Sequence, residues 1–416
     1  MKEDKIFVNQ EQLQRWQLIE LVRAGQITLK EAAAKMGVSY RQAKRLKHAV
    51  EAEGLEALRH GNCGRRAWNR TNPELCQQVL DLSKNIYKGF NDTHFAEILG
   101  GREAIDLSRE TIRKLRRQAG IAPKQQRKAK KHYKRRARKA QEGMMLLWDG
   151  SPHAWFGLAH PSCCLLAAID DATSRVVAAR FFPFEGSVGY FWLLRQVVDQ
   201  FGIPLSIYQD RHAALRRNDD NWSLEEQLAG RQEPTQVGLA LEMLGIKPIF
   251  ALSPQAKGRV ERLFGTLQDR LVAELTLNKV SGIEEANEFL ATSFIEGFNR
   301  RFAVSPRETE KAWRPVAKEI DVERIISFRY LATVSNDNAV RLGGVIIDIP
   351  PGPRGRSYAR TRVEVRQLLD GSWRVYASDR LIARHLSTTL TEPVRALQRK
   401  RRGKGGRSYA LVYTNE

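Results

Sequence analysis

Residues 253–264 read SPQAKGRVERLF and place one acidic residue, Glu261, among the cations Lys257, Arg259 and Arg262. The Ser-Pro pair that opens the stretch is typical of a helix start, with serine as N-cap and proline at the first helical position. Apolar residues then recur at helical spacing and predict a buried stripe: Val260, Leu263, Phe264, Leu267 and Leu271. Glu261 falls beside that stripe, so its carboxylate can border the core without entering it. A helix that only held phosphates would gain nothing from an acid there.

Two segments upstream predict strands that end in an acid. MMLLWDG (144–150) is an apolar run closed by Asp149, and PLSIYQD (204–210) is a shorter one closed by Asp210. Between them SCCLLAAIDDATSRVVAARFF (162–182) predicts a hairpin, and SVGYFWLLRQVVDQFG (187–202) predicts an amphipathic helix. With a further strand at 246–252, the order β-β-β-α-β-α-β-α predicts an α/β layered domain.

Carboxylates from neighbouring strands and a flanking helix can converge on one point. Asp149, Asp210 and Glu261 are therefore candidate ligands for Mg²⁺ or Mn²⁺, which prefer oxygen donors. Two such ions about 3.5–4 Å apart activate the attacking oxygen and stabilise the leaving oxygen in phosphoryl transfer. The alternative is that each acid is an ordinary turn residue, because acids are frequent in turns.

The charge of the chain indicates a polyanionic partner. Its 416 residues carry 69 Lys and Arg against 47 Asp and Glu, a formal charge of +22. Nucleic acid is the partner that such an excess favours. No apolar run approaches the roughly 18 residues of a membrane-spanning helix, and MKEDKIFVNQ lacks the apolar core of a signal peptide. We therefore expect a cytoplasmic, DNA-associated protein with no membrane partner.

Residues 1–60 are predicted to form a helix-turn-helix domain. Thr28 is a candidate N-cap, Gly37 supplies the turn, and Ser39 caps a second helix. That second helix carries the cations expected in the major groove: Arg41, Lys44 and Arg45. The alternative is a helical hairpin with a solvated basic face.

Residues 70–122 predict a second helix-turn-helix of the winged type, followed by a basic linker at 123–142. The last helix of this unit, capped by Ser108, is expected to contact DNA through Arg109, Arg113 and Arg116; the alternative is a packed helix with its arginines in water. KQQRKAKKHYKRRARK (124–139) holds ten Lys or Arg and no acid, so we expect it to follow the DNA backbone. The linker contacts are expected from Lys130, Lys134, Arg135 and Arg136.

The C-terminal part is predicted to be mostly β. Residues 325–394 alternate apolar and polar side chains, and Asp370-Gly371 is a strong hairpin signal. We expect a small antiparallel β-barrel there, followed by a basic tail at 395–416.

WDGS (148–151), YQDRH (208–212) and SPQAKGRVERLFGTLQDRL (253–271) resemble the signatures of DDE transposases and retroviral-type integrases. More narrowly, they are similar to bacterial insertion-sequence transposases of the ISNCY type. The most specific part is the pattern Pro-Gln-x-x-Gly-x-x-Glu, which ends at Glu261, and DDATSR (170–175) matches a hairpin of such cores. The resemblance covers nearly the whole chain.

The resemblance implies an RNase H-like catalytic core over residues 143–310, with Asp149, Asp210 and Glu261 as the triad that binds two Mg²⁺ ions. Such enzymes cleave the ends of a mobile element with water and then join the freed 3′-hydroxyl to target DNA. It also implies double-stranded DNA partners, both inverted-repeat ends and target, and a dimer or tetramer on DNA.

Two departures from the family pattern concern the surroundings of the triad. Fifty residues lie between Asp210 and Glu261, more than in many integrases, and the excess reads as an inserted loop with a short helix. Many relatives carry a cation seven positions after the glutamate, whereas this chain has Gln268, with Arg270 as a possible replacement.

Further DNA contacts are expected close to the triad. They are Lys257, Arg259, Arg262 and His212. Asp170 and Asp171 are interpreted as turn formers rather than metal ligands.

Two rival functions share parts of this sequence pattern. A DNA-binding regulator derived from an inactive transposase would bind the same ends without cleaving them. A structure-directed nuclease with the same core would cut without joining and would need no recognition helices.

Overall fold

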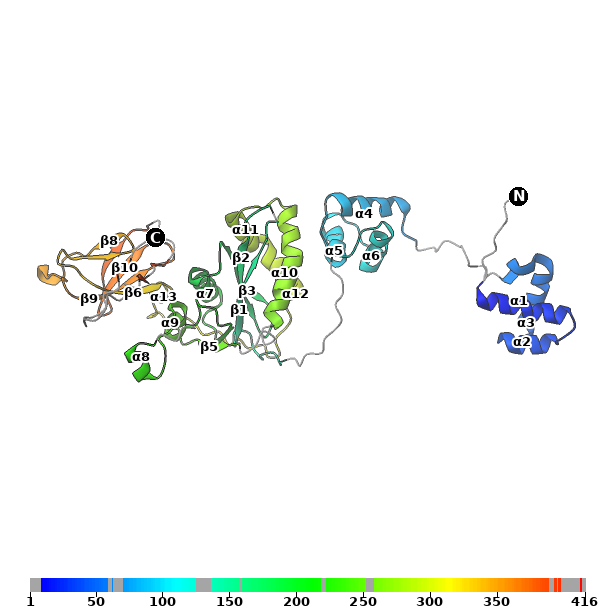
Figure 1. Cartoon of the computed structure of the whole chain (residues 1–416), viewed down its shortest axis with the longest axis horizontal. Helices are drawn as coiled ribbons and strands as arrows, with labels where there is room; N and C mark the ends of the chain where they lie inside the picture. The colour runs from blue at the N-terminus through cyan, green and yellow to red at the C-terminus, as the bar shows by residue number, and fades with distance from the viewer. Residues whose placement is uncertain are drawn as a thin grey trace, which may run out of the picture. The chain divides into compact units, whose positions relative to one another are not determined.

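The computed structural model describes residues 9–58, 62, 70–124, 136–157, 159–217, 222–251, 258–388, 393–394, 396–397 and 412–413 (Figure 1). It divides into two compact units, Met1–Gln78 and Val79–Glu416. In the described part, no helix is both long and apolar enough to cross a membrane.

The first unit contains the predicted pair of helices joined by a tight turn. Its helices are α1 (Gln10–Arg23), α2 (Leu29–Met36), α3 (Tyr40–Glu53) and the short η1 (Gly54–Leu58). Thr28 caps α2 in a capping box with Glu31, Gly37 ends it with a left-handed φ of 66°, and Ser39 caps α3. The expected DNA-contacting cations of α3 are all exposed: Arg41, Lys44 and Arg45.

Three helices follow: α4 (Pro73–Asn85), α5 (Asp92–Arg102) and α6 (Arg109–Gln118). Asn91 and Ser108 accept hydrogen bonds from the first turns of α5 and α6. Residues 70–124 are all described and contain no strand, so the predicted wing is absent and the unit consists of helices alone.

Arg116 of α6 is a structural residue, so its prediction as a DNA contact is wrong. It lies one turn after the buried Ile112 and is itself only 5% exposed. Its guanidinium donates to the Asp92 carboxylate at 2.7 Å and to the Phe90 carbonyl at 3.1 Å. Burial lowers the pKa of Arg116. The other two predicted contacts on this helix, Arg109 and Arg113, are exposed, and Arg113 pairs with Glu110.

The central domain is a five-stranded sheet with helices on both faces. Its strands are β1 (Leu146–His153), β2 (Cys163–Asp170), β3 (Val176–Phe182), β4 (Ser206–Gln209) and β5 (Lys247–Phe250). The spatial order is β3-β2-β1-β4-β5, with antiparallel pairing from β3 to β1 and parallel pairing from β1 to β5. Its helices are α7 (Ser187–Phe201), α8 (Leu224–Ala229), α9 (Gln236–Met243), α10 (Gly258–Leu277), α11 (Ile283–Phe289), the π-helical η3 (Leu290–Phe294) and α12 (Ile295–Phe302). The predicted order of strands and helices is observed, with α8 as the helix of the inserted loop.

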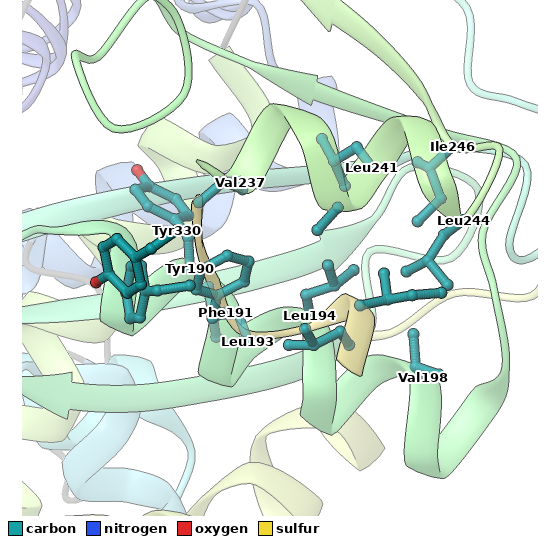
Figure 2. Close-up of a cluster of buried hydrophobic side chains, with 14 of the residues drawn as sticks. Tyr190, Phe191, Leu193, Leu194, Val198, Val237, Leu241, Leu244, Ile246 and Tyr330 are labelled. Carbon is teal, nitrogen blue, oxygen red and sulfur yellow. The ribbon is translucent and has the colours of Figure 1, made fainter. Parts of the chain in front are cut away.

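Two hydrophobic cores lie on opposite faces of this sheet. The first contains Leu146 and Trp148 of β1 with side chains of α7 and α9, and Figure 2 shows Phe191 and Leu241 among them. The second contains Leu147 of β1 with the buried stripe of α10. Figure 1 shows α7 and α10 on the two sides of the sheet.

The C-terminal part forms an open sheet, so the predicted closed barrel is not observed. After α13 (Val322–Ile325), the strands are β6 (Phe328–Thr333), β7 (Ala339–Leu342), β8 (Val345–Asp348), β9 (Arg362–Gln367), β10 (Trp373–Ala377) and β11 (Arg380–His385), with η4 (Pro353–Gly355) between β8 and β9. Four of them pair in the order β11-β10-β9-β6, and β7 pairs only with β8. The sheet buries one face against α7, where the rings of Phe328 and Phe191 are 4.9 Å apart. Packing on a helix covers this apolar face, so the sheet has no need to close on itself. Of the predicted basic tail, only β12 (Ala396–Leu397) and β13 (Val412–Tyr413) are described.

Arg116→Met should lower the free energy of unfolding by about 2–3 kcal/mol, because it removes charged hydrogen bonds from a buried site. Urea denaturation followed by circular dichroism measures the change. Arg113→Met, whose guanidinium is about half exposed, should change stability by less than about 0.5 kcal/mol. Equal stability of the two variants would contradict the structural role of Arg116.

Candidate functional site

Asp149 and Asp210 are brought level by the pairing of β1 with β4. The parallel register sets Leu147 opposite Tyr208, so two residues further along each chain Asp149 comes level with Asp210. The side chains in between agree with this register, since Trp148 Nε1 donates to Gln209 Oε1 at 2.8 Å.

The position of Asp149 differs from the prediction in one respect. It lies in the middle of β1 rather than at its end, because antiparallel pairing with β2 continues as far as His153. Asp210 directly follows β4, as predicted.

Both aspartates lie on the face of the sheet that α10 covers. Side chains alternate between faces along a strand, so Asp149 shares the face of Leu147, and Asp210 shares the face of Tyr208. Leu147 belongs to the core beneath α10, and Tyr208 packs against that core. The two carboxylates therefore project to the side where Glu261 is carried.

Glu261 lies in the first turn of α10 and is exposed. The predicted stripe is confirmed, with Val260 and Leu267 at 0% exposure and the remaining members also buried. The predicted helix start at Ser253 and Pro254, and the predicted DNA contact Lys257, lie outside the described residues.

The three carboxylates are not gathered closely enough to hold an ion in this structure. Among the described residues, no group of three or more His, Cys, Asp or Glu side chains could ligate a metal. The sheet thus brings the two aspartates to the face that α10 covers, and α10 carries Glu261, but the three carboxylates do not form a ligand group here.

Two contacts fix α10 against the sheet on either side of Glu261. Gln268 Nε2 donates to Ser151 Oγ at 3.1 Å, two residues beyond Asp149 on β1. At the start of the helix, Arg259 forms an ion pair with Asp171 of the β2–β3 turn. Gln268 thus stands where many relatives carry a cation and contacts the sheet.

Arg270 does not replace that missing cation. Its guanidinium donates to Glu97 of α5 at 2.6 Å, and its side chain is only 11% exposed. It stacks on the ring of Phe302 in addition. These contacts hold α5 against α10 and engage the guanidinium of Arg270 within the protein.

Two of the predicted DNA contacts bind the protein, and Arg136, still 45% exposed, stays a predicted DNA contact as well. Arg259 is 15% exposed and, with Arg136, donates to the carboxylate of Asp171, which has no exposed side-chain surface. Asp171 is therefore a buried anchor as well as a turn residue. The prediction that Arg259 contacts DNA is wrong, because its side chain is largely buried and bound to Asp171. Asp170 is a turn former as predicted, accepting hydrogen bonds from the backbone of Gly143 and Thr173.

Of four further predicted DNA contacts, one is described by the structure and three are not. Arg262 is exposed, and its Nε donates to the Gly258 carbonyl of its own helix at 2.7 Å. The remaining linker contacts lie outside the described residues: Lys130, Lys134 and Arg135.

His212 is tied to the site through its backbone. Its N–H donates to Asp210 Oδ1 at 2.8 Å, and its Nδ1 lies 3.8 Å from the carboxylate of Glu185. Glu185 lies on the opposite, α7-covered face of β1, beside Gly150, and no sequence pattern predicted this contact. It accepts a hydrogen bond from the Tyr190 hydroxyl at 2.6 Å, and a side chain at Gly150 would overlap its carboxylate.

The electrostatics of this group agree with its geometry. Burial raises the pKa of Tyr190 well above its usual value, and the charges of Glu185, Asp149 and Asp210 raise it further. No periodic signal marks Glu185, which lies in the loop between β3 and α7. The small residue directly after Asp149 was the one hint that another group approaches β1 closely.

Comparison of the sequence with known proteins shows the family of this chain. Residues 14–67 match the model of a helix-turn-helix domain. The transposase for insertion sequence IS1202 of Streptococcus pneumoniae is 33% identical, over 75% of this chain and 73% of its own length. The protein y4bF of Sinorhizobium fredii, which carries the name of a transposase, is 35% identical over 75% of this chain, and the chain spans 66% of that protein's length.

Comparison with solved structures does not strengthen this family assignment. The catalytic core of HTLV-2 integrase, in complex with magnesium, matches 36% of this chain and 84% of its own at 18% identity. Its TM-score of 0.26 is too low to support an argument, so the assignment rests on the sequence relatives. The first helix-turn-helix and the likeness to transposases are confirmed, and the chain belongs to the insertion-sequence transposases.

Proposed function

We propose that this chain is a DNA transposase that cleaves the ends of an insertion sequence and joins them to target DNA. Asp149, Asp210 and Glu261 would be its metal-binding triad. The observation that carries the proposal is the register of β1 and β4, which brings two aspartates level on the face that α10 covers. Glu261, in the first turn of the helix that covers this face, is the proposed third carboxylate.

The donor set suits Mg²⁺, with Mn²⁺ as a substitute, because all three side chains offer carboxylate oxygens. When bound, a pair of such ions activates the attacking oxygen and stabilises the leaving oxygen. To ligate the same ions, Glu261 has to approach the two aspartates, since the three carboxylates do not form a ligand group in this structure.

The residues around the triad hold its parts in place. The Trp148–Gln209 hydrogen bond fixes β1 against β4, and the Gln268–Ser151 hydrogen bond fixes α10 against β1. The His212 N–H holds one oxygen of Asp210. Such contacts keep ligands in one orientation and so reduce the reorganisation that ion and DNA binding require.

The basic helices would supply recognition. Exposed cations on α3 suit a major groove, and exposed cations on α6 suit a second contact on the same DNA. Both ends of an element must be held together for joining, so we propose a dimer or tetramer assembled on DNA.

The triad predicts a specific loss of chemistry. Asp149→Asn, Asp210→Asn and Glu261→Gln should each reduce Mg²⁺-dependent joining of pre-cleaved ends by about 10²–10³-fold, because each removes one charged ligand. Affinity for end DNA, measured by fluorescence anisotropy, should stay within about twofold. Asp199→Asn and Glu296→Gln are matched controls, since both acids lie in exposed ion pairs of helix surfaces.

The same assay separates the rival functions. Joining that persists in all three triad variants would contradict the catalytic assignment. End binding without cleavage by the natural chain would favour a regulator, and cleavage without joining would favour a nuclease.

The recognition helix makes a separate prediction. Lys44→Ala should weaken DNA binding and reduce the slope of log K against log salt by about 1, because one phosphate contact is lost. Arg23→Ala, which removes an exposed cation paired with Glu20 on α1, is the control. An unchanged salt slope in Lys44→Ala would show that α3 does not face the DNA backbone at this residue.

A further inference from the structure

We propose that Asp171 is a positioning residue for Glu261, and that it acts by holding the first turn of α10 and the end of the basic linker on the β2–β3 turn. The proposal rests on the proposed function, because it assigns Asp171 a role toward one member of the triad. It also assigns Arg259 and Arg136, two cations near the site, a part in the internal organisation of the site.

The carboxylate of Asp171, in the β2–β3 turn, is contacted from two other segments, the linker end and α10. Arg136 Nη2 donates to its carboxylate at 2.6 Å, and the backbone N–H of Lys139 donates at 2.8 Å. Arg259 of α10 donates to the same carboxylate, and its other amino group donates to the Arg136 carbonyl at 2.7 Å. Linker, turn and helix therefore meet at one carboxylate.

A neighbouring arginine strengthens the link between the linker and the turn. Arg138 Nη1 donates to the Ser174 hydroxyl at 2.7 Å and to the carbonyl oxygens of Asp171 and Ala172 at 3.3 and 3.2 Å. The linker end is thus held at several points, and among the described residues Arg259 joins α10 to it.

The burial of Asp171 makes the anchor strong. Its side chain has no exposed surface, and a buried carboxylate is costly unless cations and N–H groups surround it. The Arg259 side chain is only 15% exposed, so water competes little with Asp171 for its guanidinium. A buried pair of this kind restricts a helix far more than an exposed surface pair does.

The first turn of a helix is where such a restriction matters. Its N–H groups lack partners within the helix, so the first turn frays unless a neighbouring group holds it. Glu261 is two residues from Arg259 in that turn. The anchor therefore limits the motion of the segment that carries the third carboxylate.

The anchor also sets the position of Glu261 along β1. Asp171 N–H donates to the Met145 carbonyl at 3.0 Å, just before β1 begins, and Asp149 lies four residues further on. Gln268 contacts Ser151 beyond Asp149. Asp149 thus lies between the two anchor points on β1, and Glu261 lies between Arg259 and Gln268 on α10.

Two variants test the anchor from its two sides. Asp171→Asn removes the charge that holds Arg259, and Arg259→Met removes the helix contact while leaving Asp171 with Arg136 and the Lys139 N–H. Each should reduce joining of pre-cleaved ends by about 10–100-fold, the usual effect of losing a group that orients a metal ligand. Affinity for end DNA should stay within about twofold of the natural chain.

A second readout separates positioning from a general loss of structure. Mn²⁺ binding to the DNA-free protein, measured by electron paramagnetic resonance, should weaken several-fold in both variants, and the Mg²⁺ concentration for half-maximal joining should rise. The double variant should be no worse than the more severe single variant, because both remove the same contact. Asp199→Asn and Arg195→Met, which break an exposed aspartate–arginine pair on α7, are the matched controls and should behave as the natural chain.

Several outcomes would overturn the proposal. A parallel loss of DNA affinity in Arg259→Met would make Arg259 a DNA contact. Unchanged Mn²⁺ binding together with a lowered melting temperature would make the anchor merely structural, and Arg259→Met decides this if Asp171→Asn fails to fold. If Glu261→Gln is inactive while both anchor variants resemble the natural chain, the positioning role fails and the proposed function stands. If Glu261→Gln remains active, the proposed function itself fails.

Discussion

The alternation of side chains along β1 is the constraint on which the candidate site depends. Neighbouring residues of this strand belong to different cores: Trp148 packs with α7 and α9, and Leu147 packs beneath α10. A shift of β1 by one residue would exchange the two faces and turn Asp149 away from α10. Pairing with β2 over the full length of the strand, and with β4 on the other side, prevents this shift. The position of the candidate catalytic acid is therefore secured by hydrophobic burial on both faces of the sheet.

The high positive charge of the chain has two uses in this structure. Exposed cations on α3 and α6 are available to a polyanion, whereas Arg116, Arg259 and Arg270 are largely buried and bound to acids. The stretch that opens α10 combines three roles. Val260 enters the core, Arg259 holds the helix to the β2–β3 turn, and the exposed Glu261 is the proposed metal ligand. An acid among cations is thus consistent with a helix whose neighbouring positions make different contacts.

Local sequence patterns were sufficient to predict the order of strands and helices, the buried stripe of α10 and the N-caps at Thr28, Ser39 and Ser108. These features depend on residues a few positions apart, so a single sequence displays them. The missed features depend on partners distant along the chain. Asp171 and Arg259 are 88 positions apart, and Arg116 is 24 positions from Asp92, so no local sequence pattern predicts either ion pair. The open C-terminal sheet was missed for the same reason, because its covering surface on α7 lies far away in the sequence. The sequence pattern singled out the two aspartates and Glu261 as candidates, whose role as ligands stays a prediction, but it did not mark Glu185 or the Asp171 contacts.

The central claim is that Asp149, Asp210 and Glu261 bind the same ions. Iron-directed cleavage tests it most directly: Fe²⁺ replaces Mg²⁺ in the complex with end DNA, and ascorbate with peroxide generates radicals that cut the backbone beside the metal. If the three acids share the ions, the cuts cluster at residues 149, 210 and 261, are all suppressed together by excess Mg²⁺ and are all lost in Asp149→Asn. Cuts at Asp149 and Asp210 without any near Glu261, or cuts elsewhere in the chain, would contradict it.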